Sequence, residues 1–177
     1  MTKGLMVMIK ELTVPELPEY VEEIAALHLA SFDDKRTMRQ LCDDLLKYSE
    51  IQGFRCLVSV RGNAVNGFLF GYTSSPEQFY RGLIDQFISV ENQEILNGSF
   101  EVVSLAVKQG DRQNGIGTKL LQALTAEPGR YYLTSDVHDV RANAFYYKND
   151  WQLITSNLNL HPNIAPKNLY YKQTAHV

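Results

Sequence analysis

The segment of this sequence with the clearest chemical potential is a glycine-containing loop, Arg112-Gln113-Asn114-Gly115-Ile116-Gly117. The apolar run Val102 to Val107 before it predicts a buried strand, and the leucines Leu120, Leu121 and Leu124 after it predict an amphipathic helix. Unpaired N–H groups and the helix dipole attract anions to such a helix N-terminus, and glycines let the ligand approach the backbone. The loop therefore predicts a phosphate or pyrophosphate site.

The loop differs from the two common nucleotide-binding loops. A Walker A loop continues with Gly-Lys-Ser/Thr at its second glycine, whereas Gly115 is followed here by Ile116 and Gly117. A dinucleotide fingerprint needs a third glycine near Leu120, and the sequence has none there. On these six residues alone, an ordinary loop between a strand and a helix remains the alternative.

Two signatures resemble those of the GNAT superfamily of N-acetyltransferases. The first, Arg/Gln-x-x-Gly-x-Gly/Ala, is matched by Arg112, Gly115 and Gly117 after an apolar strand. The second, Ala-x-x-aromatic-Tyr-x-Lys-x-Gly-Phe, is similar to the run Ala142-Asn143-Ala144-Phe145-Tyr146-Tyr147-Lys148-Asn149-Asp150-Trp151. The resemblance is specific between Phe100 and Trp151, and before that only the order of elements agrees.

The second signature also departs from the family pattern. Asp139 stands where the family often has Asn, and Asp150-Trp151 replaces Gly-Phe at the end of the helix. These departures bear on the contacts that this helix is expected to make with pantetheine.

The resemblance implies that acetyl-CoA is the co-substrate. Backbone groups of the strand before the loop would hold pantetheine, and one N–H there would face the thioester oxygen. The positions that the resemblance assigns to cofactor binding are Leu105, Ala106, Val107, Arg112, Gln113, Asn114, Gly115, Ile116, Gly117, Thr118, Asp139, Ala142 and Tyr146.

Direct acyl transfer to an amine needs a base, stabilisation of an oxyanion, and an acid for the departing thiolate. Tyr146 matches the family tyrosine that protonates the thiolate, and its alternative is a role as a core aromatic. Glu101 matches a glutamate that in some members deprotonates the amine, directly or through water. Asp136 is the rival base, and an edge glutamate is otherwise solvated.

The pattern of apolar residues predicts a single domain over residues 1–177, with an α/β fold built on a mixed sheet. Strands are expected at 6–12, 54–60, 65–72, 100–108, 131–137, 151–159 and 168–173, and helices near 21–28, 37–46, 75–88, 116–126 and 140–149. This order, β-α-α-β-β-(α)-β-α-β-α-β-β, agrees with a GNAT-like acyl-CoA N-acyltransferase fold. Thr37 and Gln40 form a predicted capping box, and Ser75 is the expected N-cap of the inserted helix.

The acceptor is the least defined part of the prediction. The segment 74–97 lengthens the connection before the central strand and, in a GNAT-like fold, would border the acceptor cleft. A small-molecule amine, such as an aminoglycoside or a polyamine, is the expected acceptor. A protein-directed acetyltransferase would share every motif, and a non-catalytic acyl-CoA-binding module would have no use for Tyr146.

Composition limits the class of protein. Seventeen Lys and Arg against 20 Asp and Glu give a net charge of −3 without a basic stripe, so no nucleic-acid partner is expected. Cys42 and Cys56 are expected to be reduced, and no apolar run reaches the length of a membrane span or of a signal peptide core. We therefore expect a cytoplasmic enzyme without a membrane partner, for which a C₂ homodimer is the commonest assembly.

Other catalytic classes lack their residues. The sequence has no Gly-x-Ser-x-Gly elbow, so Ser104 and Ser135 are expected to be structural hydroxyls and not nucleophiles. The histidines are scattered without ligand spacing, which predicts that no metal is bound. They are His28, His138, His161 and His176.

Overall fold

The computed structural model describes residues 6–175, so His176 lies outside the described residues. The chain divides into two compact units, each built from two separate segments of sequence. Residues 6–72 and 102–126 form the first unit, and residues 73–101 and 127–175 form the second. Strand β4 (Phe100–Val107) contributes to both. A single domain over the whole chain stays a prediction.

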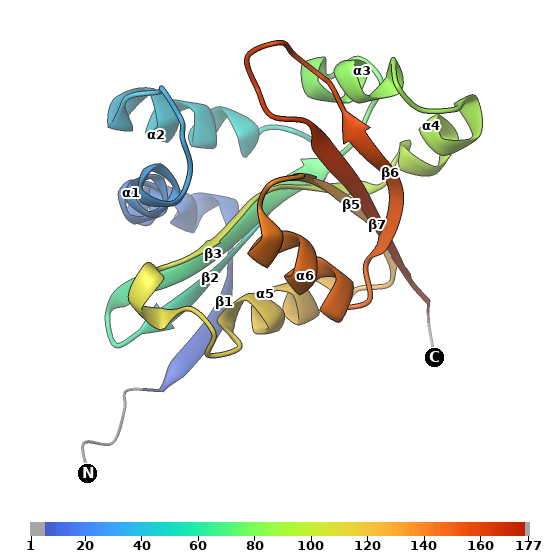
Figure 1. Cartoon of the computed structure of the whole chain (residues 1–177). Coiled ribbons are helices and arrows are strands. Elements are labelled where there is room, and N and C mark those ends of the chain that lie inside the picture. Colours follow the sequence, from blue (N-terminus) through green and yellow to red (C-terminus); the bar gives the residue numbers. More distant parts are fainter. Residues whose placement is uncertain (1–5, 176–177) are drawn as a thin grey trace. The chain divides into compact units, whose positions relative to one another are not determined.

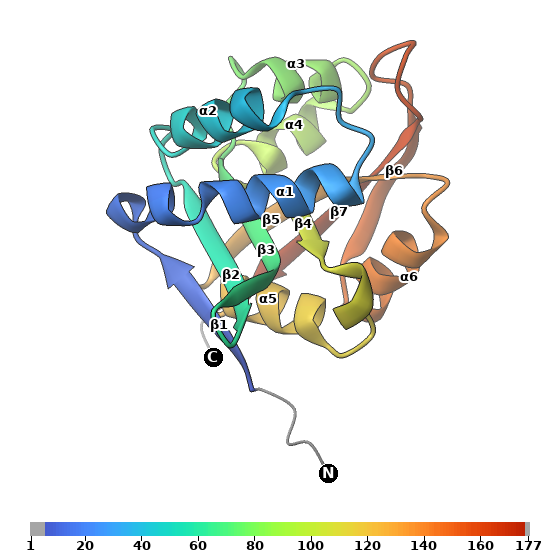
Figure 2. The ribbon, with the colours of Figure 1, turned by 90° about the vertical axis from the view of Figure 1, so that its left-hand side faces the viewer.

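The first unit contains three antiparallel strands in the order β1-β2-β3, together with the later part of β4. In Figures 1 and 2, α1 and α2 lie on one side of β2 and β3, and α5 lies on the other. Its elements are β1 (Val7–Leu12), η1 (Val14–Glu19), α1 (Val21–Ser31), α2 (Met38–Tyr48), β2 (Arg55–Arg61), β3 (Ala64–Thr73), η2 (Gln109–Asp111) and α5 (Ile116–Thr125).

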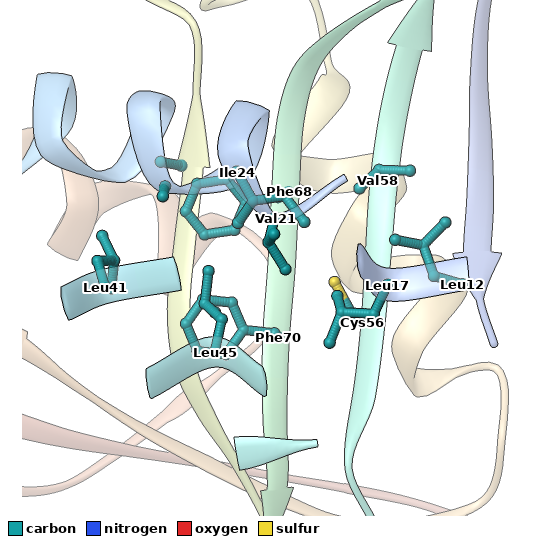
Figure 3. Packing of buried hydrophobic residues seen from close by; sticks show 12 residues of the cluster. Leu12, Leu17, Val21, Ile24, Leu41, Leu45, Cys56, Val58, Phe68 and Phe70 are labelled. Atoms are coloured by element: carbon teal, nitrogen blue, oxygen red, sulfur yellow. The ribbon is translucent and has the colours of Figure 1, made fainter. Parts of the chain in front are cut away.

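Alternation along β2 and β3 produces these two faces. Cys56 and Val58 on β2 and Phe68 and Phe70 on β3 pack with the buried residues of α1 and α2 (Figure 3). On the opposite face, a Cβ added to Gly67 would lie 3.1 Å from Ile116 Cγ2. The absence of a side chain at this position therefore lets α5 approach β3 closely.

Local signals predicted much of this unit. Thr37 Oγ1 accepts a hydrogen bond from the N–H of Gln40 at 3.2 Å, and the N–H of Thr37 donates to Gln40 Oε1 at 2.9 Å. The predicted capping box at the start of α2 is thus confirmed. Between β2 and β3, Gly62 adopts a φ of 63°, which a tight hairpin turn requires.

The second unit is a smaller mixed sheet with helices on it. The first residues of β4 pair in parallel with β5, and β7 lies between β5 and β6, antiparallel to both. Its further elements are α3 (Phe79–Asp85), α4 (Val90–Leu96), β5 (Gly129–Asp136), α6 (Val140–Lys148), β6 (Gln152–Leu158) and β7 (Lys167–Thr174). Hydrogen bonding through the chain gives the strand order β1-β2-β3-β4-β5-β7-β6, which confirms the predicted mixed α/β fold.

The segment before β4 differs from the single helix that the sequence predicts. The N-cap of α3 is Gln78 and not Ser75. Residues 75–78 form a turn of their own before the helix, in which the N–H of Gln78 donates to the carbonyl of Ser75 at 3.2 Å and Gln78 Oε1 accepts from the N–H of Ser75 at 3.1 Å. A second helix, α4, follows, and its N-cap Ser89 accepts from the N–H of Asn92 at 3.1 Å. Both helices pack against Tyr132 of β5 and Leu169 of β7.

Three further features concern the cysteines, membrane spans and metal ligands. Cys42 and Cys56 are free thiols, and burial raises the pKa of Cys56 to about 12. Across residues 6–175, no helix has the length and apolar character needed to cross a bilayer. The same part of the chain contains no group of three or more His, Cys, Asp and Glu side chains placed to hold a metal ion.

Candidate functional site

The predicted phosphate loop lies between η2 and α5 in the first unit. Gln113 and Gly115 both have positive φ, 66° and 78°, and Gly115 is the N-cap of α5. No side chain caps this end of the helix, and within residues 6–175 the N–H groups of Ile116, Gly117 and Thr118 have no hydrogen-bond acceptor. The loop therefore presents a helix N-terminus that an anion can complete.

The side chains of the loop leave this end open. Arg112, Gln113, Asn114 and Gly115 are exposed, whereas the Ile116 side chain is buried and offers a ligand only its backbone. Arg112 Nε donates to the carbonyl of Val107 at 2.9 Å, which ties the loop to the end of β4. The two terminal nitrogens of this guanidinium make no hydrogen bond within the described chain, so they remain available to an anion.

Contacts with the β2–β3 hairpin hold the start of the loop. Asp111 Oδ1 accepts from Arg61 Nη1 at 2.8 Å, and the N–H of Lys108 donates to the carbonyl of Asn66 at 2.8 Å. Of the strand residues assigned to pantetheine, Ala106 packs in the α1–α2 core and Leu105 is half-buried. These contacts fix the loop before any ligand arrives.

In the second unit, the helix of the second signature is capped by its own aspartate. Asp139 Oδ1 accepts from the N–H of Ala142 at 3.0 Å, and Asn143 Nδ2 donates to the carbonyls of Asp136 and Asp139, both at 2.8 Å. An aspartate at N-cap does the work of the usual asparagine. The departure at Asp139 thus preserves the start of α6, and cofactor contacts of Asp139 and Ala142 stay a prediction.

Tyr146 lies on α6 among aromatic rings. Its ring centroid is 5.3 Å from that of Phe145, 5.5 Å from that of Tyr170 and 6.1 Å from that of Trp151. Burial, with a smaller contribution from the Asp139 carboxylate, raises the Tyr146 pKa well above its ordinary value. The hydroxyl makes no hydrogen bond within residues 6–175. Tyr146 therefore stays protonated at neutral pH, and its hydroxyl proton is not engaged within the described residues. An acid for a thiolate needs such a proton.

Glu101 lies at the start of β4, opposite Tyr132 of β5. Only 5% of the residue is exposed, and Tyr132 Oη donates to Glu101 Oε1 at 2.9 Å. Burial raises the pKa of Glu101 to about 7, against the lowering effects of Tyr132 and Arg81. A carboxyl group that titrates near neutral pH is suited to take a proton from an amine. The rival, Asp136, already accepts from the N–H of His138 at 2.8 Å.

Glu101 and Tyr146 belong to opposite faces of the second unit's sheet. Tyr132 and its cross-strand partner Tyr171 pack with α3 and α4, whereas Tyr170, one residue away on β7, contacts Tyr146 of α6. The predicted residues thus lie in three places. Some are in the loop and at the end of β4, some are on α6, and Glu101 is covered by α3 and α4.

Sequence reasoning missed a hydrogen-bonded chain in the first unit. His28 Nε2 lies 2.8 Å from Asp34 Oδ2, and His28 Nδ1 lies 3.0 Å from Ser104 Oγ. Because the ionised Asp34 only accepts, Nε2 carries the proton and Nδ1 accepts from Ser104. Ser104 is 6% exposed in the middle of a strand, where a substrate carbonyl has no approach. We interpret these hydrogen bonds as a structural link between α1 and β4.

The free energy of unfolding is expected to fall as the pH drops below 6.5, the ordinary pKa of His28, because burial lowers that pKa in the folded state. The unfolded chain then binds more protons than the folded one, so this contribution is complete above 6.5 and is lost as the pH falls. Urea denaturation between about pH 7 and pH 5 measures it.

His28→Gln should remove this pH dependence, and exposed His161→Gln should retain it. Subtracting the variant from the wild type cancels the contributions of carboxyl groups. Parallel pH curves for His28→Gln and the wild type would contradict the assignment of a neutral, buried imidazole.

Neither the protein-family models nor the curated proteins give a match to this sequence. Solved structures, in contrast, match over nearly the whole chain. NAA60 of Arabidopsis thaliana, solved with a bisubstrate analogue, has a TM-score of 0.66 at 13% identity over 95% of this chain and 98% of its own.

Two aminoglycoside acetyltransferases are also similar. An aminoglycoside 6′-N-acetyltransferase complexed with coenzyme A has a TM-score of 0.64 at 15% identity over 96% of this chain and 98% of its own. A second, from an uncultured soil metagenomic sample and in complex with sisomicin, has a TM-score of 0.59 at 22% identity over 81% and 87%. The fold of this chain is therefore that of the GNAT acetyltransferases, as the two signatures predicted.

Proposed function

We propose that this protein transfers the acetyl group of acetyl-CoA to a primary amine by direct attack. The observation that carries the proposal is the uncapped N-terminus of α5, behind a loop with the Arg112, Gly115 and Gly117 pattern. In a GNAT fold, that end of the helix is where the pyrophosphate of coenzyme A would be held. The N–H groups of residues 116–118 and the free guanidinium nitrogens of Arg112 supply the donors.

The side chains of the second unit supply the proton transfers. Glu101, with a pKa of about 7, takes the proton of the amine directly or through one water. The neutral nitrogen attacks the thioester carbonyl, a C–N bond forms, and a β4 N–H stabilises the oxyanion. The C–S bond then breaks, and Tyr146 gives its proton to the thiolate. The second proton that the nitrogen loses on becoming an amide leaves through water and returns Tyr146 to its neutral form.

A small-molecule amine is the acceptor that we favour. Helices α3 and α4 cover the face of the sheet that bears Glu101 and leave it 5% exposed. A compact amine, or a water bound between amine and carboxylate, reaches such a group more easily than a peptide backbone does. The aminoglycoside acetyltransferases of similar fold support this class, and a protein-directed acetyltransferase is the alternative. Cytoplasmic action, and a homodimer as the assembly, accompany the proposal.

Thiol release from acetyl-CoA, followed with a panel of acceptors, tests the proposed reaction. We expect turnover with aminoglycosides or polyamines, and a loss of about 10²-fold in kcat in Tyr146→Phe, which keeps the ring and removes the acid. Tyr147→Phe, on the exposed side of the same helix, is the matched control.

The outcomes separate the alternatives. Turnover only with peptides would move the acceptor to the protein class. Tight binding of acetyl-CoA without turnover on any amine would leave a non-catalytic acyl-CoA-binding module, and a fully active Tyr146→Phe variant would remove Tyr146 as the acid.

A further inference from the structure

The first of the two helices that precede β4 carries a buried arginine. Arg81 of α3 is 1% exposed, and its guanidinium donates from Nε to Asp85 Oδ1 at 2.8 Å and from Nη2 to the carbonyl of Gln93 at 2.7 Å. Nη1 donates to Ser74 Oγ at 3.1 Å. Burying a charged side chain is costly even when it is paired. Covering the sheet does not require a charged side chain at this position, so we looked for another role of the guanidinium in its hydrogen bonds.

The hydrogen bonds continue from Arg81 to the proposed base. Ser74 Oγ lies 2.6 Å from Tyr132 Oη, which donates to Glu101 Oε1 at 2.9 Å. A guanidinium only donates, so Ser74 accepts from Arg81 and must direct its own proton to Tyr132. Tyr132 has a single proton, and it goes to the carboxylate. The four groups thus form a relay in which every proton points from Arg81 toward Glu101.

The surroundings make this relay strong. Ile84, Leu96 and Leu158 pack around Tyr132 and exclude water, so hydrogen bonds here act in a low dielectric. Three titratable or charged groups bear on Glu101: Arg81 and Tyr80 from α3, and Tyr132 from β5. Asp85 is engaged with Arg81, and Tyr80 Oη is 2.6 Å from Thr134 Oγ1. The relay is thus the only chain of donors that ends on Glu101 within residues 6–175.

We propose that Arg81 is a positioning residue for acetyl transfer, which acts through Ser74 and Tyr132 to orient the Glu101 carboxylate and to favour its ionised form. The inference rests on the proposed function and deepens it. Tyr132 occupies Oε1, and Oε2 makes no hydrogen bond in the described chain, so Oε2 is the oxygen left to accept the proton of the amine. The segment 74–97 then has a role in the chemistry, because it supplies both Ser74 and Arg81.

The pH dependence of kcat/KM tests the relay. Tyr132→Phe removes only the final donor, Ser74→Ala the middle link and Arg81→Met the guanidinium. We expect the acidic limb of the profile to move to higher pH by about one unit in Tyr132→Phe and by less in Ser74→Ala, with about a fivefold loss of kcat/KM at pH 7 in the former. Because Arg81→Met is the variant most at risk of unfolding, the other two carry the test.

Tyr80→Phe is the matched control, since it removes a hydrogen-bonded tyrosine hydroxyl of the same cluster that lies outside the relay. Its acidic limb should stay where it is in the wild type. A role in packing alone would lower kcat/KM by the same factor at every pH and would overturn the inference.

A second readout does not depend on catalysis. In protein labelled with ¹³C at the glutamate carboxyl carbons, the resonance absent from Glu101→Gln reports the titration of Glu101 directly. A midpoint that moves up in Tyr132→Phe supports the relay even if no amine is acetylated, in which case the proposed function fails alone. A midpoint unchanged in both Tyr132→Phe and Ser74→Ala overturns the relay, whatever the activity.

Discussion

Glu101→Gln is expected to slow acetyl transfer by about 10²- to 10³-fold and, at the same time, to make the folded protein more stable above neutral pH. The loss of rate follows because a glutamine cannot take the proton of the amine. The gain in stability follows because the wild type holds a carboxylate at 5% exposure, whereas the glutamine is neutral and still accepts from Tyr132. Few substitutions of a buried polar group are expected to stabilise a fold.

The direction of the stability change depends on pH. Folding raises the pKa of Glu101 from 4.5 to about 7, so the folded state binds more protons than the unfolded state in between. The contribution of Glu101 to stability is therefore most favourable below 4.5 and is lost as the pH rises through 7. A shift of this size corresponds to roughly 3 kcal/mol, which Glu101→Gln should recover at about pH 8.

Urea denaturation and initial rates, measured on the same preparations across pH, check both effects. Glu94→Gln, an exposed position on α4, is the control that removes one negative charge without touching the buried cluster. A Glu101→Gln variant that is as active as the wild type would remove Glu101 from the mechanism. A variant that is less stable than the wild type at alkaline pH and more stable than it at acidic pH would contradict a raised pKa of Glu101 in the folded state.

Gly117→Glu is expected to abolish binding of acetyl-CoA, with at least about a hundredfold rise in Kd, while the protein stays folded. Gly117 is the second residue of α5, where a glutamate has better helix propensity than glycine and interacts favourably with the helix dipole. The same carboxylate would stand at the N–H groups assigned to the pyrophosphate and repel it. Calorimetric titration measures the binding, and thermal unfolding measures the fold.

Gln122→Glu is the matched control for this variant. It adds the same charge to the same helix, at an exposed position more than a turn further along. Gln122→Glu should bind acetyl-CoA like the wild type. Equal binding by Gly117→Glu would show that the loop does not hold the ligand.

The features that the sequence predicts well are those that depend on residues close together in the chain. The spacing of Gly115 and Gly117 before a leucine-rich helix predicts an open helix N-terminus, and the structure has one there. Thr37 and Gln40, three residues apart, predict the start of α2 for the same reason. In each case the interacting groups lie within one turn of the chain, so their spacing alone fixes their geometry.

Contacts between distant segments could not be predicted in this way. Ser104 lies 76 residues from His28, and Tyr132 lies 58 residues from Ser74. An arginine on a short helix is normally solvated, so nothing in the sequence near Arg81 indicates that it is buried. The insertion of β7 between β5 and β6 is likewise a matter of pairing across the sheet. Such contacts depend on how distant segments pack against each other in the folded chain.

The claim on which the account depends is that the N-terminus of α5 binds the pyrophosphate of acetyl-CoA. Calorimetric titration of acetyl-CoA into the wild-type protein, repeated with inorganic pyrophosphate present as a competitor, tests it most directly. We predict saturable binding at one site with a Kd on the order of micromolar, weakened by pyrophosphate. No detectable binding by the folded wild-type protein would contradict it and would leave a GNAT fold without its co-substrate.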